Sequence, residues 1–249
     1  MARISIVIPT LEEEQYLGRT LRQLQILDPP PHEIVIVDGG STDRTVEIAR
    51  AAAALISVPT RILTESDRGR SRQMNAGAAV ATGEILCFLH ADTLIPDDAM
   101  AIVTAALADE RIVGGGFISL MCGDRTTRWG ISLQNYLKTY WTPLLFRPHL
   151  FIRGLRAIFG DQTLFCRRQE FDRCGGFDPE LPILEEIDLC FKLVRWGRLK
   201  VVDRVVFSSD RRVAHWGSWQ ASVLYWAIGL GWLLGISPTW LRRWYPDLR

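Results

Sequence analysis

The stretch Gly83–Thr93, GEILCFLHADT, contains five consecutive apolar residues, Ile85–Leu89, that stop at the polar sequence His90-Ala91-Asp92. A short apolar run of this kind is typical of a strand that is buried on both faces of a sheet. Open α/β sheets bind their ligands beyond the carboxyl ends of the strands, which is where Asp92 would lie. The stretch therefore predicts a carboxylate at the edge of a binding crevice, while a strand followed by an ordinary polar turn is the simpler interpretation.

The same strand pattern recurs through the first part of the chain, and helical patterns lie between the strands. Leu17, Leu21 and Leu24 recur at the spacing of one helix face, before a break at Asp28–Pro31. Strands are predicted at 4–8, 34–37, 61–64 and 85–89, and helices at 14–27, from a cap at Ser41 or Thr42 to residue 54, at 71–81 and at 96–107. This alternation through about residue 110 indicates a parallel sheet with crossover helices.

The second half of the chain is less regular. A strand is expected over Ile112–Leu120, where the consecutive glycines Gly114–Gly116 indicate a close approach of another group to the backbone. Phe165 lies in a short strand-like run, Leu184–Trp196 is expected to be helical, and Val205–Phe207 is expected to form a late strand. The strict alternation of strand and helix therefore ends near residue 110.

The composition is that of a globular protein and argues against several classes of function. The 249 residues are 48% hydrophobic and 23% charged, and a net charge of +1 gives no electrostatic support for nucleic-acid binding. Five cysteines without C-x-x-C spacing indicate free thiols in a reducing compartment, not a structural zinc site. The apolar run Ile4–Ile8 is too short for the core of a signal peptide, so we expect a cytoplasmic protein.

Asp38 ends the second predicted strand as Asp92 follows the fourth, so both should lie along one edge of the sheet. The pair Gly39-Gly40 permits a sharp turn and lets a ligand approach the backbone. The sequence VDGGSTD therefore predicts either a ligand contact from Asp38 or a carboxylate that only stabilises the turn. The residues alone leave both interpretations open.

Three arginines, Arg68, Arg70 and Arg72, follow the third predicted strand. Their planar guanidinium groups suit phosphate oxygens, although a solvated loop is the simpler interpretation for any one of them. The chain contains neither G-x-x-x-x-G-K-[ST] nor G-x-G-x-x-G. A P-loop or a dinucleotide fingerprint therefore does not account for the arginines.

Three acids, Glu185, Glu186 and Asp188, lie at the start of a predicted helix. Acids favour the first helical turn because of the positive end of the helix dipole. Crowded carboxylates also raise one another's pKa, which suits a general base near neutral pH. The pattern predicts either an ordinary helix start or a catalytic base.

Four segments, taken in order, resemble a family 2 glycosyltransferase of the GT-A fold. They cover most of residues 3–210 and are ISIVIPTLEEE, IVIVDGGSTDRT, RSRQMNAGAAVATGEILCFLHADT and GGFDPELPILEEIDLCFKL. The chain is especially similar to a short bacterial subgroup linked to arsenosugar biosynthesis, and FGDQTLFCRR is part of that similarity.

The resemblance implies an α/β chain of GT-A type, with a Rossmann-like, mostly parallel sheet flanked by helices. It implies a glycosyltransferase domain over 1–212, with a nucleotide-binding half, 1–110, and an acceptor half, 111–212. The remaining residues, 213–249, are expected to form an aromatic, apolar helical appendage at the C-terminus.

The resemblance also assigns roles to individual residues. Glu186 fills the position of the base that deprotonates the acceptor, with Asp188 and Glu185 as alternatives. Asp92 occupies the last position of the D-x-D motif, which holds Mg²⁺ or Mn²⁺ on the donor diphosphate. The residues expected at the sugar nucleotide are Pro9, Thr10, Glu13, Asp38, Arg68, Arg70, Asn75, Ala91 and Asp92, and those expected at the acceptor are Gly160, Asp161 and Gln162. Arg211 and Arg212 are either further diphosphate ligands or a solvated basic pair.

This chain departs from the family pattern at three positions. Glu12 stands where Asn is usual, His90 replaces the first acid of D-x-D, and Glu186 stands where Asp is usual. The metal expectation therefore depends on Asp92 alone, although Mg²⁺ usually takes only one or two carboxylates together with phosphates and waters. Glu186 keeps a carboxylate and moves it about one methylene further out, a displacement that matters in catalysis.

The function implied is an inverting, metal-assisted glycosyltransferase of the hexosyltransferase type. It would move a sugar from a nucleotide diphosphate to an acceptor hydroxyl or a lipid phosphate. One alternative is a catalytically weakened protein that binds nucleotide sugars or scaffolds at a membrane, to which the changes at His90 and Glu186 would point. Another is a sugar-phosphate nucleotidyltransferase, but the loop Pro9–Glu14 is acidic and lacks the glycines that such an enzyme needs.

The C-terminal part is rich in tryptophan and uncharged over a long stretch. Residues 216–241 contain no charged side chain, and six of the nine tryptophans lie at or after Trp216. The 14 residues Val223–Ile236 are fewer than the ~20 that a membrane-spanning helix needs. Aromatics flanked by Arg242-Arg243 suit the inner face of the cell membrane, a second copy of the chain or packing on the domain. The basic, apolar stretch Leu144–Phe159 leaves the same alternatives open.

Overall fold

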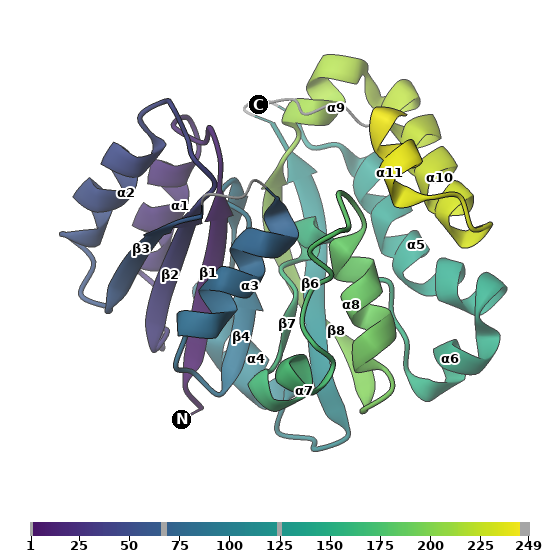
Figure 1. The fold of residues 1–249 in the computed structure, drawn as a ribbon, viewed down its shortest axis with the longest axis horizontal. Coiled ribbons are helices and arrows are strands. Elements are labelled where there is room, and N and C mark those ends of the chain that lie inside the picture. Colours follow the sequence, from purple (N-terminus) through teal and green to yellow (C-terminus); the bar gives the residue numbers. More distant parts are fainter. Residues whose placement is uncertain (1, 66–68, 124–125, 245–249) are drawn as a thin grey trace.

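The computed structural model describes residues 2–65, 69–123 and 126–244, which build an eight-stranded sheet covered by helices (Figure 1). The strand order is β3-β2-β1-β4-β7-β6-β8-β5. The strands are β1 (Ile4–Thr10), β2 (Glu33–Asp38), β3 (Thr60–Thr64), β4 (Ile85–Phe88), β5 (Thr93–Leu94), β6 (Ile112–Cys122), β7 (Phe165–Arg167) and β8 (Arg198–Ser209). The helices are α1 (Leu17–Leu24), α2 (Thr45–Ala53), α3 (Arg70–Val80), α4 (Ala99–Ala106), α5 (Trp129–Phe146), α6 (Pro148–Arg153), α7 (Arg168–Arg173), α8 (Glu185–Leu193), α9 (Arg211–Trp216), α10 (Ser218–Leu233) and α11 (Pro238–Leu241), with 3₁₀ turns η1 (Gly160–Gln162) and η2 (Arg242–Trp244).

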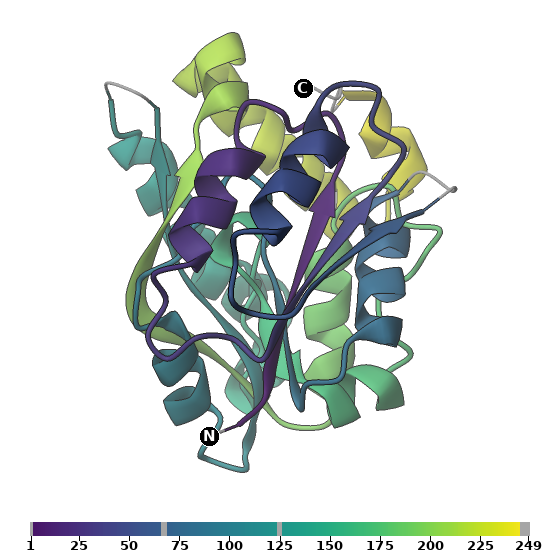
Figure 2. The ribbon, with the colours of Figure 1, turned by 90° about the vertical axis from the view of Figure 1, so that its left-hand side faces the viewer.

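The first half of the sheet is parallel, as the alternation of strands and helices predicts. β1 pairs in parallel with β2 and β4, and β2 pairs in parallel with β3. Every residue of β1 and β2 is buried because helices cover both faces of the sheet. Figure 2 shows α1 and α2 on one face and α3 on the other. The expected α/β class is therefore confirmed.

Beyond β4 the sheet is mixed, which refines the expectation of a mostly parallel sheet. β7 lies between β4 and β6 and runs antiparallel to both, whereas β6 and β8 are parallel. β8 is also longer than the predicted late strand, Val205–Phe207. Exposed residues are frequent along β8, and the exposed Lys200, Asp203 and Arg204 interrupt the apolar run that would have revealed it.

The glycines of β6 permit the close approach that the sequence indicates. A Cβ on Gly114 would lie 2.7 Å from the carbonyl oxygen of Phe165 in β7. A Cβ on Gly115 would overlap the carbonyl oxygen of Lys200 in β8. The tight packing of β6 between its two neighbours therefore depends on the absence of side chains at these positions.

Two apolar layers, one on each face of the sheet, form the core. The five cysteines, all within the described ranges, are free thiols, as their spacing predicts. Burial raises the pKa of Cys87 and of Cys190 to about 12. These two thiols are therefore protonated, inert parts of the core.

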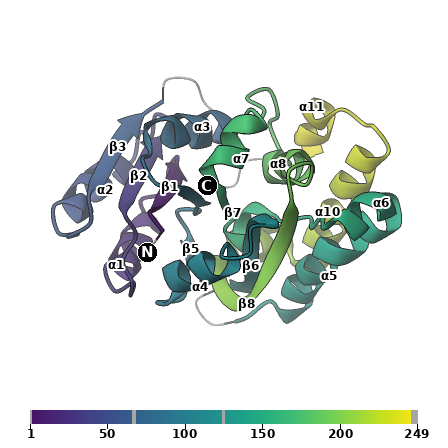
Figure 3. The same ribbon diagram turned by 90° about the horizontal axis from the view of Figure 1, so that it is seen from below.

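Helices α5, α6, α10 and α11 gather at the end of the molecule opposite α2 and β3 (Figures 1 and 3). The uncharged C-terminal stretch forms α10, so the expected helical appendage is present. The 18-residue α5 was not predicted, because its buried face mixes Ile131 with the polar Asn135 and Lys138 and shows no apolar period. Across the three described ranges, no helix combines the length and apolar character needed to cross a bilayer.

The packing of α3 on β1 gives a test of this arrangement. A Cβ added to Gly77 of α3 would overlap Val7 of β1. We therefore expect Gly77→Ala to lower the free energy of unfolding by about 1–3 kcal/mol, because the added methyl overpacks the core. Urea denaturation measures the change.

The matched control is Gly229→Ala in α10. No described atom beyond its own helix lies within 4 Å of that Cβ, so the better helix former should raise the free energy of unfolding by about 0.5–1 kcal/mol. Two variants of equal stability would contradict the close contact between α3 and β1.

Candidate active site

A cavity of about 970 Å³ opens beyond the carboxyl ends of β1 and β4 and extends to α5, α8 and α10. This is the edge of the sheet at which the sequence predicts a binding crevice. The predicted residues that line it are Pro9, Thr10, Glu13, Arg70, Ala91, Asp92, Gly160, Asp161, Glu185, Glu186, Arg211 and Arg212. Among the described residues, Asp38, Asn75, Gln162 and Asp188 do not line it. Arg68 lies outside the described residues.

Asp38, at the end of β2, is buried within its own turn. Its carboxylate accepts hydrogen bonds from the backbone N–H groups of Gly40 (3.0 Å) and Ser41 (2.8 Å) and from the Thr10 hydroxyl (3.3 Å). Gly40 has φ 84°, the left-handed conformation that suits glycine. These contacts favour the interpretation of Asp38 as a residue that stabilises the turn. Its contact with a nucleoside stays a prediction from the resemblance.

Asn75 and Asp188 have partners within the protein. Asn75 donates to the backbone carbonyl of Phe177 at 2.8 Å and accepts from the N–H of that residue at 3.0 Å. The Asp188 carboxylate lies 2.8 Å from Lys192 Nζ, one helical turn further along α8. Both side chains therefore stabilise the fold around α8, and neither faces the cavity.

Gln162 is buried and holds the turn η1 in place. Its Nε2 donates to the carbonyl oxygen of Phe117 at 3.1 Å, and its Oε1 accepts from the N–H of Phe159 at 2.9 Å. The turn presents Gly160 and Asp161 to the cavity. Gln162 therefore does not face the cavity but holds Gly160 and Asp161, the other predicted acceptor residues, in position.

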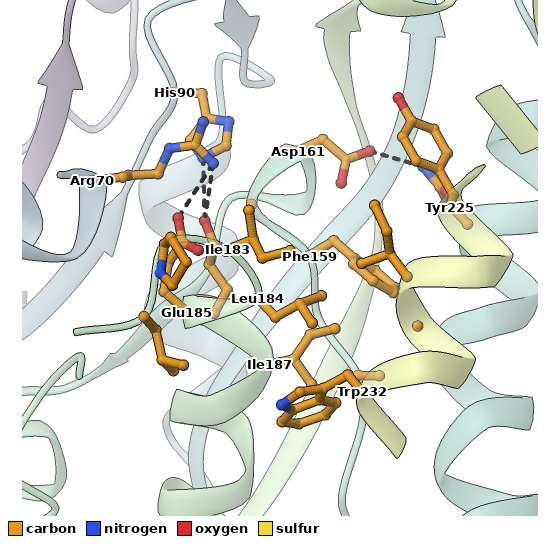
Figure 4. A pocket seen from close by; sticks show the side chains of 18 of the residues that line it. Arg70, His90, Phe159, Asp161, Ile183, Leu184, Glu185, Ile187, Tyr225 and Trp232 are labelled. Carbon is orange, nitrogen blue, oxygen red and sulfur yellow. Dashed lines mark hydrogen bonds and ion pairs between the residues drawn. The ribbon is translucent and has the colours of Figure 1, made fainter. Parts of the chain in front are cut away.

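Helix α8 begins with two buried carboxylates, Glu185 and Glu186, and Figure 4 shows Arg70 and His90 directed at this helix start. Arg70 Nη1, at the beginning of α3, lies 3.4 Å from Glu185 Oε1 and 3.8 Å from Glu186 Oε1. His90 Nε2, just beyond β4, lies 3.4 Å from Glu186 Oε1. Three segments that are distant in the sequence therefore meet in one charged cluster.

The two carboxylates differ in their readiness to ionise. Burial and the repulsion of Glu186 raise the pKa of Glu185 to about 7. Burial also disfavours the charge of Glu186, but the hydrogen bond with His90 and the charge of Arg70 outweigh it and hold the pKa of Glu186 below its usual value. Glu186 is therefore the member of the pair that stays ionised at neutral pH, as a proton acceptor must.

Because Gly160 has no side chain, the charged cluster has room beside it. A Cβ at position 160 would overlap both the His90 ring and the Glu186 carboxylate. The turn η1 can therefore pass directly against the two side chains, which brings the neighbouring Asp161 to the same cavity.

Arg211, at the carboxyl end of β8, links two acids from the other half of the sheet. Its Nη1 and Nη2 donate to the two carboxylate oxygens of Glu13 at 2.8 and 2.6 Å, and Nη2 lies 3.3 Å from Asp92 Oδ2. Burial, with repulsion from Arg70, lowers the pKa of the adjacent Arg212 to about 10. Both arginines line the cavity, and Arg211 is held by Glu13 and Asp92, which counts against a solvated basic pair. Their contact with a diphosphate stays a prediction.

Asp92 is the residue that could hold a divalent ion. Within the described ranges, no three histidine, cysteine, aspartate or glutamate side chains form a metal-binding group. Asp92 offers one carboxylate to the cavity, and its contact with Arg211 shows that this position favours a positive charge. His90 is directed at Glu186 instead. An ion at Asp92 would need further oxygen ligands from a bound diphosphate and from water.

A second polar group, on α5 and α10, was missed by the sequence reasoning. Lys138 is buried with its ammonium group 5.3 Å from the centre of the Tyr225 ring and 5.1 Å from that of Trp226. Burial lowers the pKa of Lys138 to about 8, against the effect of the nearby Asp161. Asn135 donates to Asp161 at 3.2 Å. A lone lysine within an aromatic stretch was the available signal, but only the fold brings α5 to α10.

The rest of the cavity wall is apolar. Figure 4 shows apolar side chains between the charged start of α8 and the side of the cavity formed by Asp161 and Tyr225. The apolar lining residues include Phe146, Phe159, Ile183, Leu184, Ile187, Phe191, Leu230, Trp232 and Leu233. A ligand that fills both parts of the cavity must therefore combine polar and apolar groups.

Comparison with known proteins identifies relatives of the chain. Residues 5–176 match the family model described as Glycosyl transferase family 2. The PGL/p-HBAD biosynthesis glycosyltransferase of Mycobacterium bovis (strain BCG / Pasteur 1173P2) is 29% identical over 191 residues, which cover 75% of this chain and 69% of the relative.

Two solved structures share the fold. The mannosyltransferase PcManGT from Pyrobaculum calidifontis, in complex with GDP-Man and Mn²⁺, has a TM-score of 0.70 at 22% identity, over 94% of this chain and 62% of that one. The glucosyl-3-phosphoglycerate synthase from Mycobacterium tuberculosis, in complex with Mn²⁺, UDP and phosphoglyceric acid, has a TM-score of 0.65 at 19% identity, over 95% of this chain and 80% of that one. At these identities the likeness concerns the fold.

The environment of Lys138 can be measured directly, because the chain has only three lysines, Lys138, Lys192 and Lys200. Burial favours the neutral amine, so Lys138 should lose its proton as the pH rises through about 8, well below the ~10.4 of an exposed lysine. NMR titration of ¹³C-lysine-labelled protein should show one resonance with this midpoint, and Lys138→Arg should remove it. A titration in which no lysine changes near pH 8 would contradict the buried position.

Proposed function

Because this chain belongs to glycosyl transferase family 2, we propose that it moves a sugar from a nucleotide diphosphate to an acceptor, with inversion at the anomeric carbon. Its fold is of the GT-A type. The observation that carries the proposal is a shared cavity, in which an ionised Glu186 lies in the same space as Asp92 and the arginines Arg70 and Arg211. The reaction needs a base for the acceptor and positive charge for the leaving diphosphate, and both lie there.

In this proposal the donor binds along the ends of β1 and β4. The nucleoside lies against Pro9, Thr10 and Ala91, and Asp38 supports this edge from behind through its hydrogen bond from Thr10. Arg70 and Arg211 face the diphosphate, because guanidinium groups match phosphate oxygens in shape and charge. The two solved relatives, one in complex with GDP-Man and the other with UDP, support a nucleotide donor.

A divalent ion, Mg²⁺ or Mn²⁺, fits this site when the donor supplies most of its ligands. Asp92 provides one carboxylate, and diphosphate and water oxygens would complete the oxygen shell that these ions prefer. When bound, the ion neutralises charge on the leaving diphosphate. The presence of Mn²⁺ with a nucleotide in both solved relatives supports this part of the proposal.

Glu186 is the proposed general base. Its carboxylate lines the cavity and is held by Arg70 and His90. It takes the proton of the acceptor hydroxyl as that oxygen attacks the anomeric carbon from the face opposite the leaving diphosphate, and this direct displacement inverts the carbon. A lipid-phosphate acceptor is already ionised near neutral pH, so it would depend on Glu186 much less.

Two departures from the family pattern meet in one contact. Glu186, longer by one methylene than the usual Asp, reaches His90, which stands where the motif has its first acid. An acid at position 90 would repel the Glu186 carboxylate, whereas the imidazole stabilises it. This pairing supports a working catalytic site and counts against the alternative of a catalytically weakened protein.

We also propose two finer features of this protein from its sequence. Kinship with the subgroup linked to arsenosugar biosynthesis depends on the stretch FGDQTLFCRR. Contact of residues 216–241 with a membrane surface or with a second copy depends on their aromatic, uncharged character. The nucleotidyltransferase alternative is disfavoured because Glu13, in the loop after β1, brings a carboxylate to the cavity.

The first test compares two acids of α8. We expect Glu186→Gln to lower kcat by about 10²–10⁴-fold with a hydroxyl acceptor, since an amide cannot take the proton. Asp188→Asn, which removes a carboxylate that does not line the cavity, should leave kcat nearly unchanged. The assay is the release of nucleoside diphosphate from a panel of UDP- and GDP-sugars. Equal losses in the two variants, or no turnover of any donor by the unaltered protein, would count against the proposal.

The second test concerns the metal. Chelation with EDTA should remove most of the activity, and Mn²⁺ or Mg²⁺ should restore it, because the leaving diphosphate would otherwise depend on arginines alone. Asp92→Ala should lower kcat/KM for the donor by at least about tenfold. The matched control is Asp98→Ala, which removes an aspartate paired with Arg204 outside the cavity. Full activity after chelation and in Asp92→Ala would rule out the ion.

A further inference from the structure

Helices α5 and α10 carry rows of exposed apolar side chains that the proposed reaction does not explain. About one large apolar residue per turn is exposed along each helix. The members, each between 37% and 79% exposed, are Trp129, Leu133, Leu137, Trp141 and Leu145 of α5, with Trp219, Val223, Trp226 and Leu230 of α10 and the following Leu234. We call these ten residues the α5–α10 surface. Contiguous exposed apolar residues in such number mark an interaction site.

The two rows lie on helices that pack side by side. The Lys138 ammonium group of α5 lies 5.3 Å and 5.1 Å from the ring centres of Tyr225 and Trp226 of α10. The Gln134 amide of α5 also joins the two helices: its NH₂ group donates to the Ser222 hydroxyl of α10 at 2.8 Å, and its oxygen accepts from Trp226 Nε1 at 3.0 Å. Figures 1 and 3 both show the helices together at the end of the molecule remote from α2 and β3. The helices that carry the two rows therefore lie together at one end of the protein.

The two segments that build this side are basic, although Arg128 and Arg211 pair with acids outside them and Lys138 is buried. Residues 126–160 and 211–244, which contain both helices, have nine lysines and arginines and no aspartate or glutamate. The rest of the chain has 20 lysines and arginines against 28 acids, so the net charge of +1 conceals a polarised molecule. Arg147, Arg153 and Arg243 are exposed within these segments. An apolar surface with a basic surround complements an anionic lipid interface.

We propose that the α5–α10 surface docks on an anionic lipid bilayer, with its tryptophans and leucines in the headgroup region and its exposed arginines against lipid phosphates. Tryptophan is enriched at this depth in membranes, and each arginine near the surface adds electrostatic attraction. The helices lie on the bilayer and do not cross it. The 16 residues of α10 rise about 24 Å, less than the ~30 Å thickness of the hydrocarbon core.

A lipid surface explains these features better than a second copy of the chain does. In a two-fold dimer the same patch meets itself, so the basic surrounds of the two copies would be brought together and repel each other. Trp226 and Leu230 belong both to the surface and to the lining of the cavity, so a second copy of the chain would close this side of the cavity with protein. On a bilayer, by contrast, these two residues connect the lipid with the cavity.

The connection between the surface and the cavity indicates the class of acceptor. This inference about the acceptor rests on the proposed function. The cavity wall next to Glu186 is apolar, and its lining includes Phe146 and the exposed Arg147 beside the α5–α10 surface. An amphiphile could therefore leave the bilayer, place its apolar part against this wall and present its polar group to Glu186. The inferred acceptor is a membrane-resident amphiphile whose hydroxyl or phosphate receives the sugar.

The test is co-sedimentation of the full chain with vesicles. The protein should bind vesicles of phosphatidylcholine with roughly one-third phosphatidylglycerol at least about tenfold more tightly than pure phosphatidylcholine, and salt should weaken this binding. Trp219→Ala with Leu145→Ala should reduce the binding at least about tenfold. The matched control, Trp196→Ala with Leu55→Ala, removes exposed residues of the same types elsewhere and should bind normally.

A second pair of variants separates charge from apolar contact. Arg153→Ala with Arg243→Ala should weaken binding to anionic vesicles and reduce its salt dependence, whereas Arg19→Ala with Arg50→Ala, exposed at the other end of the molecule, should not. Circular dichroism verifies that each variant is folded. Absence of vesicle binding by the unaltered protein, or equal losses in the control variants, would overturn the inference. So would a stable dimer in sedimentation velocity that the Trp219 and Leu145 substitutions dissociate, if no vesicles are bound.

These experiments test the docking surface and the proposed catalytic function independently. Glu186 lies away from the α5–α10 surface, so the Glu186→Gln variant should bind vesicles as tightly as the unaltered protein does. Vesicle binding without turnover of any donor would overturn the proposed function and leave the docking surface supported. Turnover with a water-soluble acceptor, in a protein that ignores vesicles, would overturn the docking surface and its amphiphilic acceptor alone.

Discussion

Two adjacent carboxylates buried at the start of α8, Glu185 and Glu186, impose the constraint on which the site depends. A buried charge is costly unless cations and hydrogen bonds compensate it. The compensation comes from Arg70 at the start of α3 and from His90 beyond β4, so it ties the parallel half of the sheet to α8. The same contacts divide the pair into an ionised Glu186 and a Glu185 with a raised pKa, which gives neighbouring acids different chemistry.

A second long-range ion pair completes the opposite part of the cavity. Arg211 donates to Glu13 across a separation of 198 residues and also contacts Asp92, so the end of β8 is fixed against the ends of β1 and β4. The site therefore holds its own positive charge among the acids before any ligand binds. Such preorganised charge suits the proposed departure of a nucleotide diphosphate, because the groups need no reorganisation during the reaction.

The molecule is polarised in a way that its composition conceals. The half that contains β1 to β4 carries Glu13, Asp92 and the other expected donor residues, whereas α5 and α10 provide an apolar wall to the cavity and a basic, apolar exterior. Because the same two helices form the wall and the exterior, the shape of the proposed acceptor compartment and the proposed contact with a lipid surface are properties of one structural unit. Helices α5 and α10 thus link the proposed acceptor to the proposed lipid surface.

The sequence alone determined the parallel half of the sheet and the placement of Asp92 at its edge, because apolar runs locate strands and parallel strands share one carboxyl edge. It also located the acids of α8 but not their roles. Asp38 and Asp188 occupy expected positions, yet they bind their own turn and helix, since local hydrogen-bond partners leave no sequence period. Only the tertiary structure decided which acid is ionised and that Lys138 enters the cavity wall, because burial and charge depend on segments distant in the chain.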